Sequence, residues 1–248
     1  MKVCFRRRFL PCLSGFFFVL AALAVFAAGS GAAHAQVVTA GAQQAQFPMG
    51  GITVALPAPP GQGMVEVGND RNFFDPAVPD SNRLLAAFVL EKDAATLRNA
   101  SNQVLTPYAM VEVLRAGEYS TVSQDDFKEI ADSIAKQTGA LIDSSFKESE
   151  EEFNRKMKAM DLNVQVTYGK PVMLGTFFLK PDAYGFGMMA PVTANGKTTS
   201  MIVGTVLLRV KSHVIFAYFY STYQNDQTPG QVRAVSEQWA DAILAANR

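Results

Sequence analysis

Apolar and polar positions alternate in short runs between residues 162 and 220, and each run predicts a half-buried strand. The runs cover residues 162–168, 172–179, 184–191, 201–210 and 213–220. Asn195-Gly196 and Lys211-Ser212 fall between runs, and both are residue pairs that can close a tight hairpin. Connections this short join antiparallel neighbours, because parallel strands need long crossovers. The pattern therefore predicts an antiparallel sheet.

Three further strands are predicted earlier in the chain, at residues 51–57, 83–91 and 108–114. The first strand alternates apolar and polar residues and is stopped by Pro57, Pro59 and Pro60. Residues 69–82 are mostly polar and contain two prolines, which predicts a loop between the first two strands.

Residues 123–160 have the three-to-four-residue apolar spacing of helices. Ser123 can cap the first turn, with Asp126 at the third helical position. Thr138-Gly139 interrupts the segment, so it forms either two helices or one helix with a weak joint. One apolar stripe comprises Phe127, Ile130, Ile134 and Leu141, and a second comprises Phe146, Phe153, Met157 and Met160.

A last helix is predicted to start at Thr228, with Pro229 in its first turn and Gln231 completing a capping box. Its apolar stripe is Val232, Val235, Trp239 and Ile243. The last strands are apolar on both faces, so the sheet must be covered on both sides. The two helical segments can provide these layers, which predicts an α+β protein built as an α/β/α sandwich around a mainly antiparallel sheet.

This order of elements resembles the PsbP-like fold of photosystem II accessory proteins and their bacterial periplasmic relatives. The similarity spans residues 50–246 and lies in the Gly51 to Pro57 strand, the strand–helix–meander order and the amphipathic segment from Ser236 to Leu244. It implies a small exported module without assigned catalysis that assists a larger complex. The resemblance brings no shared catalytic residues to this chain.

The N-terminus has the layout of a secretory signal peptide. Four basic residues (Lys2 and Arg6 to Arg8) precede an apolar run from 16 to 28, and Ala33-His34-Ala35 supplies a small-x-small cleavage site. We therefore expect a signal peptide at 1–35, a flexible leader at 36–50 and a single domain at 51–248. Residues 6–10 resemble the twin-arginine export signal, but Phe5, Pro11 and the very apolar run favour the general secretory route.

Cleavage after Ala35 would leave a periplasmic protein without cysteine, because Cys4 and Cys12 are both removed. It would also remove four of the 22 basic residues, leaving 18 against 22 acidic ones and a net charge of −4. A mildly acidic surface disfavours nucleic acid, whose binding requires clustered positive charge. No later segment has the ~20 apolar residues of a membrane span.

Such a protein lacks the residue types that most catalytic and metal-binding sites require. His213 would be the only histidine, and Ser212 beside it is a neighbour at a turn rather than a partner in a triad. One histidine cannot supply a structural zinc site, and we expect no cofactor. Met157, Met160 and Met188-Met189 could attract copper, but helical spacing favours core packing for the first two.

Two aromatic groups are candidate binding residues. Tyr184, Phe186 and Met188 alternate with glycines, and glycine in a strand allows close approach of either a ligand or an aromatic ring from a covering helix. These three side chains are the first candidates for the wall of a site for a small apolar ligand. Phe73 and Phe74 lie among charged residues, so they either contact a protein partner or fold back on the core.

The acidic run at 148–152 is better explained as an exposed helix face than as a calcium site. Glu151 and Arg155, and likewise Glu152 and Lys156, have the i, i+4 spacing of helical ion pairs.

The leading hypothesis is an exported, non-catalytic accessory or binding module with a protein partner in the periplasm. A carrier of a lipid or other small apolar ligand is an alternative, and it would need a cavity lined by residues such as Phe177, Phe186 and Phe216. An enzyme built on carboxylates is the other alternative, and it would need a concave pocket with two carboxyl groups about 5–10 Å apart.

Overall fold

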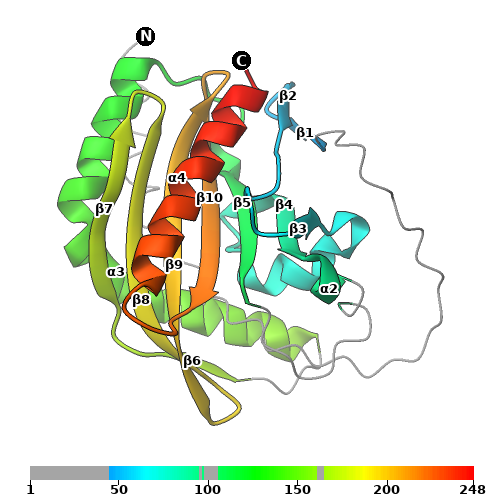
Figure 1. The fold of residues 1–248 in the computed structure, drawn as a ribbon, viewed down its shortest axis with the longest axis vertical. Coiled ribbons are helices and arrows are strands. Elements are labelled where there is room, and N and C mark those ends of the chain that lie inside the picture. The colour runs from blue at the N-terminus through cyan, green and yellow to red at the C-terminus, as the bar shows by residue number, and fades with distance from the viewer. Residues whose placement is uncertain (1–44, 95–96, 98–105, 161–164) are drawn as a thin grey trace.

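The computed structural model describes residues 45–94, 97, 106–160 and 165–248, with the backbone alone at 71–72 and 137–146. The expected signal peptide and most of the expected leader lie outside these residues. The fold is centred on one eight-stranded sheet in the order β3-β4-β5-β10-β9-β8-β6, with β7 also paired to β8 (Figure 1). Its strands are β3 (Met64–Glu66), β4 (Asn82–Leu90), β5 (Tyr108–Leu114), β6 (Val166–Tyr168), β7 (Val172–Lys180), β8 (Ala183–Ala194), β9 (Lys197–Val210) and β10 (His213–Thr222).

Every pairing in this sheet is antiparallel, which confirms the predicted α+β class. The two predicted hairpin turns are also confirmed. Asn195 and Gly196 have φ angles of 50° and 76°, and Lys211 and Ser212 have φ angles of 47° and 65°. Two successive positive φ angles define the turn whose twist matches that of the flanking strands.

Helices cover both faces of the sheet, as the sandwich prediction requires. Helix α4 (Thr228–Ala246) lies across β8, β9 and β10 on the face toward the viewer in Figure 1. Its Trp239 packs edge-on against Phe88 at 5.8 Å between ring centroids. On the opposite face, Phe127 and Phe153 of α3 (Gln124–Ala159) join a second core that includes Phe186. The sheet therefore separates two hydrophobic cores.

The two helix starts differ in how well the sequence predicted them. Ser123 caps α3 by accepting a hydrogen bond from the Asp126 N–H at 3.1 Å, as expected, and α3 is one continuous helix. The capping box predicted for α4 is wrong, because the N-cap residue is Gln227 and its side chain makes no cap hydrogen bond. The Thr228 hydroxyl instead accepts from the Gln224 and Asn225 N–H groups, each at 3.2 Å.

The segment before residue 51 is not entirely a leader. Strand β1 (Gln46–Met49) pairs with β2 (Ile52–Ala55) in a separate two-stranded sheet. Phe47 and Met49 are buried in the core on the α4 side, and this burial fixes the strand. The flexible leader expected at 36–50 is therefore wrong for Gln46–Met49, where only four residues alternate and Pro48 weakens the strand signal.

The loop predicted at 69–82 also contains regular structure. A 3₁₀ helix, η2 (Gly68–Ala77), occupies most of it and includes Pro76. The shorter elements α2 (Glu91–Ala94) and η4 (Arg115–Gly117) follow β4 and β5 respectively. Residues 162–164 of the predicted strand at 162–168 lie outside the described residues, and β6 begins at Val166. Within the described residues, no helix is long and apolar enough to cross a membrane.

Candidate functional site

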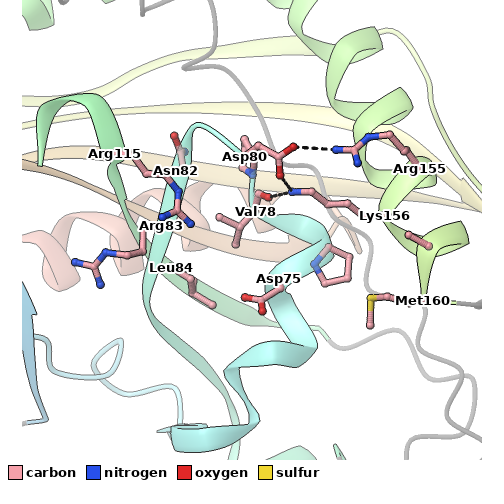
Figure 2. Close-up of a pocket in the computed structure, with 13 residues that line it drawn as sticks. Asp75, Val78, Asp80, Asn82, Arg83, Leu84, Arg115, Arg155, Lys156 and Met160 are labelled. Carbon is pink, nitrogen blue, oxygen red and sulfur yellow. Dashed lines mark hydrogen bonds and ion pairs between the residues drawn. The ribbon is translucent and has the colours of Figure 1, made fainter.

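A cavity of about 430 Å³ opens at one end of the sheet, where three stretches of the chain that are distant in sequence meet (Figure 2). The end of η2 and the turn after it form one wall, and the first residues of β4 form the next. The residue after β5 and the last turn of α3 complete the lining. Its residues are Asp75, Pro76, Val78, Pro79, Asp80, Asn82, Arg83, Leu84, Arg115, Arg155, Lys156, Ala159 and Met160.

Strand pairing explains why two of the arginines lie at the same end of the sheet. Asn82 pairs with Leu114 in the antiparallel β4–β5 register, so Arg83 and Arg115 lie next to this pair. The Arg115 N–H also donates to the Ser81 carbonyl at 2.9 Å, which holds the start of η4 against the turn before β4. The site is thus anchored to the sheet on this side.

On the opposite side, Asp80 links the turn before β4 to helix α3. Its carboxylate accepts from Arg155 at 2.9 Å and from Lys156 at 2.9 Å, as Figure 2 shows. Lys156 also pairs with Glu152 at 2.8 Å and donates to the Val78 carbonyl. The hydrogen bond from Lys156, followed by the charges of both cations, lowers the pKa of Asp80. The Asp80 carboxylate therefore stays ionised as a structural anchor.

Asn82 connects the cavity to a buried acid. Its Nδ2 donates to Oε2 of Glu112 at 2.7 Å, while Oε1 of Glu112 has no hydrogen-bond partner among the described residues. Glu112 is fully buried, and this burial raises its pKa to about 7 against the opposing effects of Asn82 and Lys156. Glu112 does not line the cavity itself, so a bound molecule would meet Asn82 first.

These groups suit binding better than acid–base chemistry. Asp80 is held ionised by two cations, and its lowered pKa makes it a weak proton acceptor and prevents its use as an acid at neutral pH. Glu112 has a pKa near neutrality, but Asn82 lies between its carboxyl group and the cavity. What the cavity offers is cationic side chains beside apolar ones.

The sheet brings Tyr184, Phe186 and Met188 together, but inside the core on the α3 side rather than along this cavity. All three are buried, and the rings of Tyr184 and Phe186 lie 5.6 Å apart. On the other face, Gly185 and Gly187 are covered by the rings of Phe178 and Phe177 from β7. The alternating glycines thus accommodate packed aromatic rings, one of the two predicted explanations, and the rings come from a neighbouring strand rather than a helix.

The two aromatic residues of η2 differ in their positions. Phe74 is fully buried and packs 6.1 Å from the Tyr108 ring, so it cannot serve as a partner contact. Phe73 is half-buried and meets Phe74 edge-on at 5.3 Å. The structure therefore selects the folded-back alternative for Phe74, because η2 turns its side chain toward the sheet.

The apolar cavity required for a carrier is not built from the expected residues. Phe177 belongs to the core on the α4 side, whereas Phe186 and Phe216 belong to the core on the α3 side. The sheet lies between them, so these three side chains cannot line one cavity. The carrier hypothesis placed Phe177 on the wrong face of the sheet, because the bulges in β7 shift the register of this strand against β8.

The acidic run of α3 is partly engaged in tertiary contacts. Glu152 pairs with Lys156 as predicted and also accepts from the Asp80 N–H at 2.7 Å. Arg155 pairs with Asp80 instead of Glu151, and Glu150 accepts from the Tyr168 N–H at 2.6 Å. The prediction of a purely solvated helix face is therefore wrong for these residues, which fasten α3 to β6 and to the η2–β4 turn.

The candidate metal ligands named from the sequence were His213 and the methionines Met157, Met160, Met188 and Met189. Within the described ranges, no group of three or more histidine, cysteine or acidic side chains is arranged to hold a metal ion. His213 is buried and its Nδ1 lies 2.9 Å from the Lys211 carbonyl oxygen. Met157 packs in the core as predicted, but Met160 is 50% exposed at the cavity because α3 ends before it.

Sequence reasoning missed the cavity, although one signal pointed toward it. Glu112 is the only charged residue in the otherwise apolar strand Tyr108–Leu114, and a lone carboxylate in such a strand requires a specific partner. The basic residues of the wall gave no signal of this kind, since they are separated by up to 73 positions in the sequence, from Arg83 to Lys156.

Comparisons with known proteins return structural matches alone. No protein-family model and no curated protein matches the chain. Among solved structures, the Ran-binding protein Mog1p of Saccharomyces cerevisiae has a TM-score of 0.32 and 11% identity, covering 81% of this chain and 94% of that one. Cyanobacterial PsbP from Synechocystis sp. PCC 6803 has a TM-score of 0.29 and 9% identity, covering 85% and 96%.

The matches thus include a PsbP, the family that the sequence resembles. TM-scores this low do not indicate a shared function.

Proposed function

We propose that this protein is an exported accessory module that acts by binding and has no catalytic activity of its own. The observation that carries this proposal is the cavity at the end of the sheet, which combines cationic and apolar side chains and whose Asp80 is held ionised by two cations. Asn82 and the Asp80 anchor hold its walls in place without a ligand. A site formed in advance is typical of proteins that bind small molecules or partner side chains.

Export is part of this proposal and rests on the signal-peptide layout of the first 35 residues. We expect cleavage after Ala35, delivery to the periplasm by the general secretory route and an intact mass beginning at Gln36. Accessory action implies a partner in the same compartment, which would meet the protein through the cavity.

Native mass spectrometry of the protein purified from its own cell envelope tests both parts. The expected result is a chain beginning at Gln36 that carries an additional bound species. Met160→Glu should remove that species, because Met160 is half-exposed at the cavity and the new carboxylate would pair with its cations. Leu179→Glu is the matched control, since Leu179 is 57% exposed on β7 and does not line the cavity.

Three results would overturn the proposal. A full-length chain that keeps residues 1–35 would contradict export. Wild-type protein without any bound species, or M160E protein that keeps its bound species as L179E does, would contradict binding through the cavity.

A further inference from the structure

The charges around the cavity are not fully neutralised by the protein itself. Three arginines and one lysine line it, against two acidic residues, in a chain with equal numbers of basic and acidic residues overall. Lys156 and Arg155 share Asp80, and Lys156 has Glu152 as a second partner. Arg83 is paired with Glu118 and also donates to the Pro48 carbonyl at 3.0 Å.

Arg115 is the one cation of the cavity wall that forms no such pair among the described residues. Within the described part of the chain, its side chain makes no hydrogen bond and no ion-pair contact, although its charge helps to lower the pKa of Glu118. It is exposed, and the residue is fixed by its position directly after β5 and by its N–H bond to Ser81. A guanidinium group on an anchored backbone, beside a cavity and with its N–H groups free of hydrogen bonds to the described residues, is suited to bind an oxyanion through two parallel hydrogen bonds.

The other residues that line the cavity indicate what kind of molecule bears the oxyanion. Val78, Leu84 and Met160 present apolar surface to the same cavity, and Met160 lies across the view from Arg115 in Figure 2. A volume of about 430 Å³ is in the range of sites for small organic molecules and exceeds what a single inorganic ion requires.

We infer that the cavity binds an organic carboxylate with a small apolar body, with Arg115 holding the carboxylate and Leu84 and Met160 contacting the body. This inference rests on the proposed function and names the ligand chemistry of the same site. The carboxylate could belong to a free small molecule or to the C-terminal residue of a polypeptide.

Isothermal titration calorimetry with three probes separates these sources. The probes are 4-phenylbutyrate, an N-acetylated pentapeptide ending in leucine with a free carboxylate, and the same peptide amidated at its C-terminus. We expect the wild-type chain to bind at least one carboxylate probe, and the amidated peptide at least tenfold more weakly than its acid form. Tighter binding of 4-phenylbutyrate would identify a free molecule, and tighter binding of the acid peptide would identify a polypeptide end.

Three variants test the role of Arg115. Arg115→Gln should weaken binding of the carboxylate probe at least tenfold, and Arg115→Lys should restore part of it, because lysine keeps the charge but loses the two-pronged geometry. Arg233→Gln is the matched control, since Arg233 is exposed on α4 at the opposite face of the sheet. Because Arg115 is exposed and its side chain makes no hydrogen bond or ion-pair contact with the described residues, R115Q should unfold at nearly the same denaturant concentration as wild type.

The inference is overturned if neither carboxylate probe binds at up to about 10 mM. It is also overturned if R115Q and R233Q bind equally, or if the amidated peptide binds as well as the acid. In each of these cases the proposed function would still stand if M160E, but not L179E, lost the species bound in native mass spectrometry.

Discussion

Asn82 and Glu112 join the cavity to the buried core, because the Asn82 amide donates to the Glu112 carboxyl group at 2.7 Å. Asn82 is the first residue of β4, and Glu112 lies two residues before the end of β5, 30 positions away in the sequence. One carboxyl oxygen of Glu112 remains without a partner in the described structure. A buried carboxylate with half of its acceptors unmet favours the protonated form.

Replacing Glu112 by Gln should therefore change how stability depends on pH. The pKa of Glu112 is about 7 in the folded chain, against an ordinary glutamate value of 4.5 that applies once the chain unfolds. The folded state then holds more protons than the unfolded state between these values, so wild-type stability falls as pH rises from 4.5 to 7. Over the full interval this loss amounts to about 3 kcal/mol.

Urea unfolding followed by the fluorescence of the single tryptophan, Trp239, measures this effect. Trp239 is fully buried and donates to the Pro57 carbonyl at 2.7 Å, so its emission reports the loss of the core. We expect E112Q and wild type to be similarly stable at pH 4.5 and E112Q to be the more stable at pH 8. An unchanged pH dependence in E112Q would show that Glu112 is not the responsible group.

Gly187 should not tolerate a side chain. A Cβ atom at this position would lie 2.0 Å from Cζ of the Phe177 ring, which is packed against the strand and cannot move away freely. We expect Gly187→Ala to destabilise the fold by about 1–3 kcal/mol through overpacking.

The control for this prediction is Gly230→Ala in the first turn of α4. A Cβ atom there meets nothing within 4 Å, and helical alanine is more favourable than glycine by up to about 1 kcal/mol. The two variants should therefore shift the urea midpoint in opposite directions. Equal midpoints for G187A and wild type would mean that Phe177 does not cover Gly187.

The sequence was sufficient for the features that local chemistry determines. The pair Asn195-Gly196 specifies its turn because asparagine and glycine accept the positive φ angles that a two-residue hairpin needs, whereas Lys211-Ser212 is a turn because only two residues separate two apolar strands. Strand Tyr108–Leu114 was predicted to the residue, since a run that is apolar at every position but Glu112 is buried on both faces. A sheet whose strands are apolar on both faces must be covered on both sides, and this requirement predicted the two helical layers.

Features made by distant contacts were not predictable in the same way. Phe47 and Met49 become a strand only because a core exists to bury them, and Phe74 turns inward only because Tyr108 lies beneath it. The cavity depends on the position of the last turn of α3 beside β4, which no local pattern encodes. Thr228 shows why a helix cap is hard to predict from sequence alone. Its hydroxyl was expected to accept from the N–H groups of the first helical turn, but it accepts from the Gln224 and Asn225 N–H groups that precede the helix.

Glu118 should stabilise the fold less as the solution becomes acidic. Arg83 donates to both of its carboxyl oxygens, and the Gly50 N–H donates to Oε1 at 3.3 Å. The hydrogen bond from Arg83 is the main cause that lowers the pKa of Glu118 below 4.5. A lowered pKa means that the stabilisation is complete above 4.5 and is lost as pH falls through the folded-state value.

Glu118→Gln should therefore reduce stability at pH 7 and reduce it less at pH 3, as measured by the same urea titration. The β1–β2 hairpin should loosen first, because the Gly50 N–H in its turn exchanges a charged acceptor for the weaker neutral oxygen of an amide. Hydrogen exchange of the Gly50 amide would show this directly. A loss of stability in E118Q that is the same at both pH values would argue against an ion pair.

Asn247 fastens the end of α4 to strand β2 and is the residue with the largest expected effect at the C-terminus. Its Oδ1 accepts from the Ala55 N–H at 2.8 Å, and its Nδ2 donates to the Ala55 carbonyl at 2.7 Å and the Ile243 carbonyl at 2.8 Å. Asn247→Ala would leave both buried backbone groups of Ala55 unsatisfied, at about 1–3 kcal/mol for each group.

Asn247→Asp separates the acceptor from the donor in this contact. Aspartate can still accept from the Ala55 N–H, but it cannot donate to either carbonyl, and its charge would lie beside two carbonyl oxygens. We expect N247D to be destabilised like N247A at pH 7 and to recover partly near pH 3, where the protonated acid regains one donor. Arg248→Ala is the control, because that side chain is exposed and should leave the urea midpoint unchanged. If N247A were as stable as R248A, the amide of Asn247 would not be what holds β2 against α4.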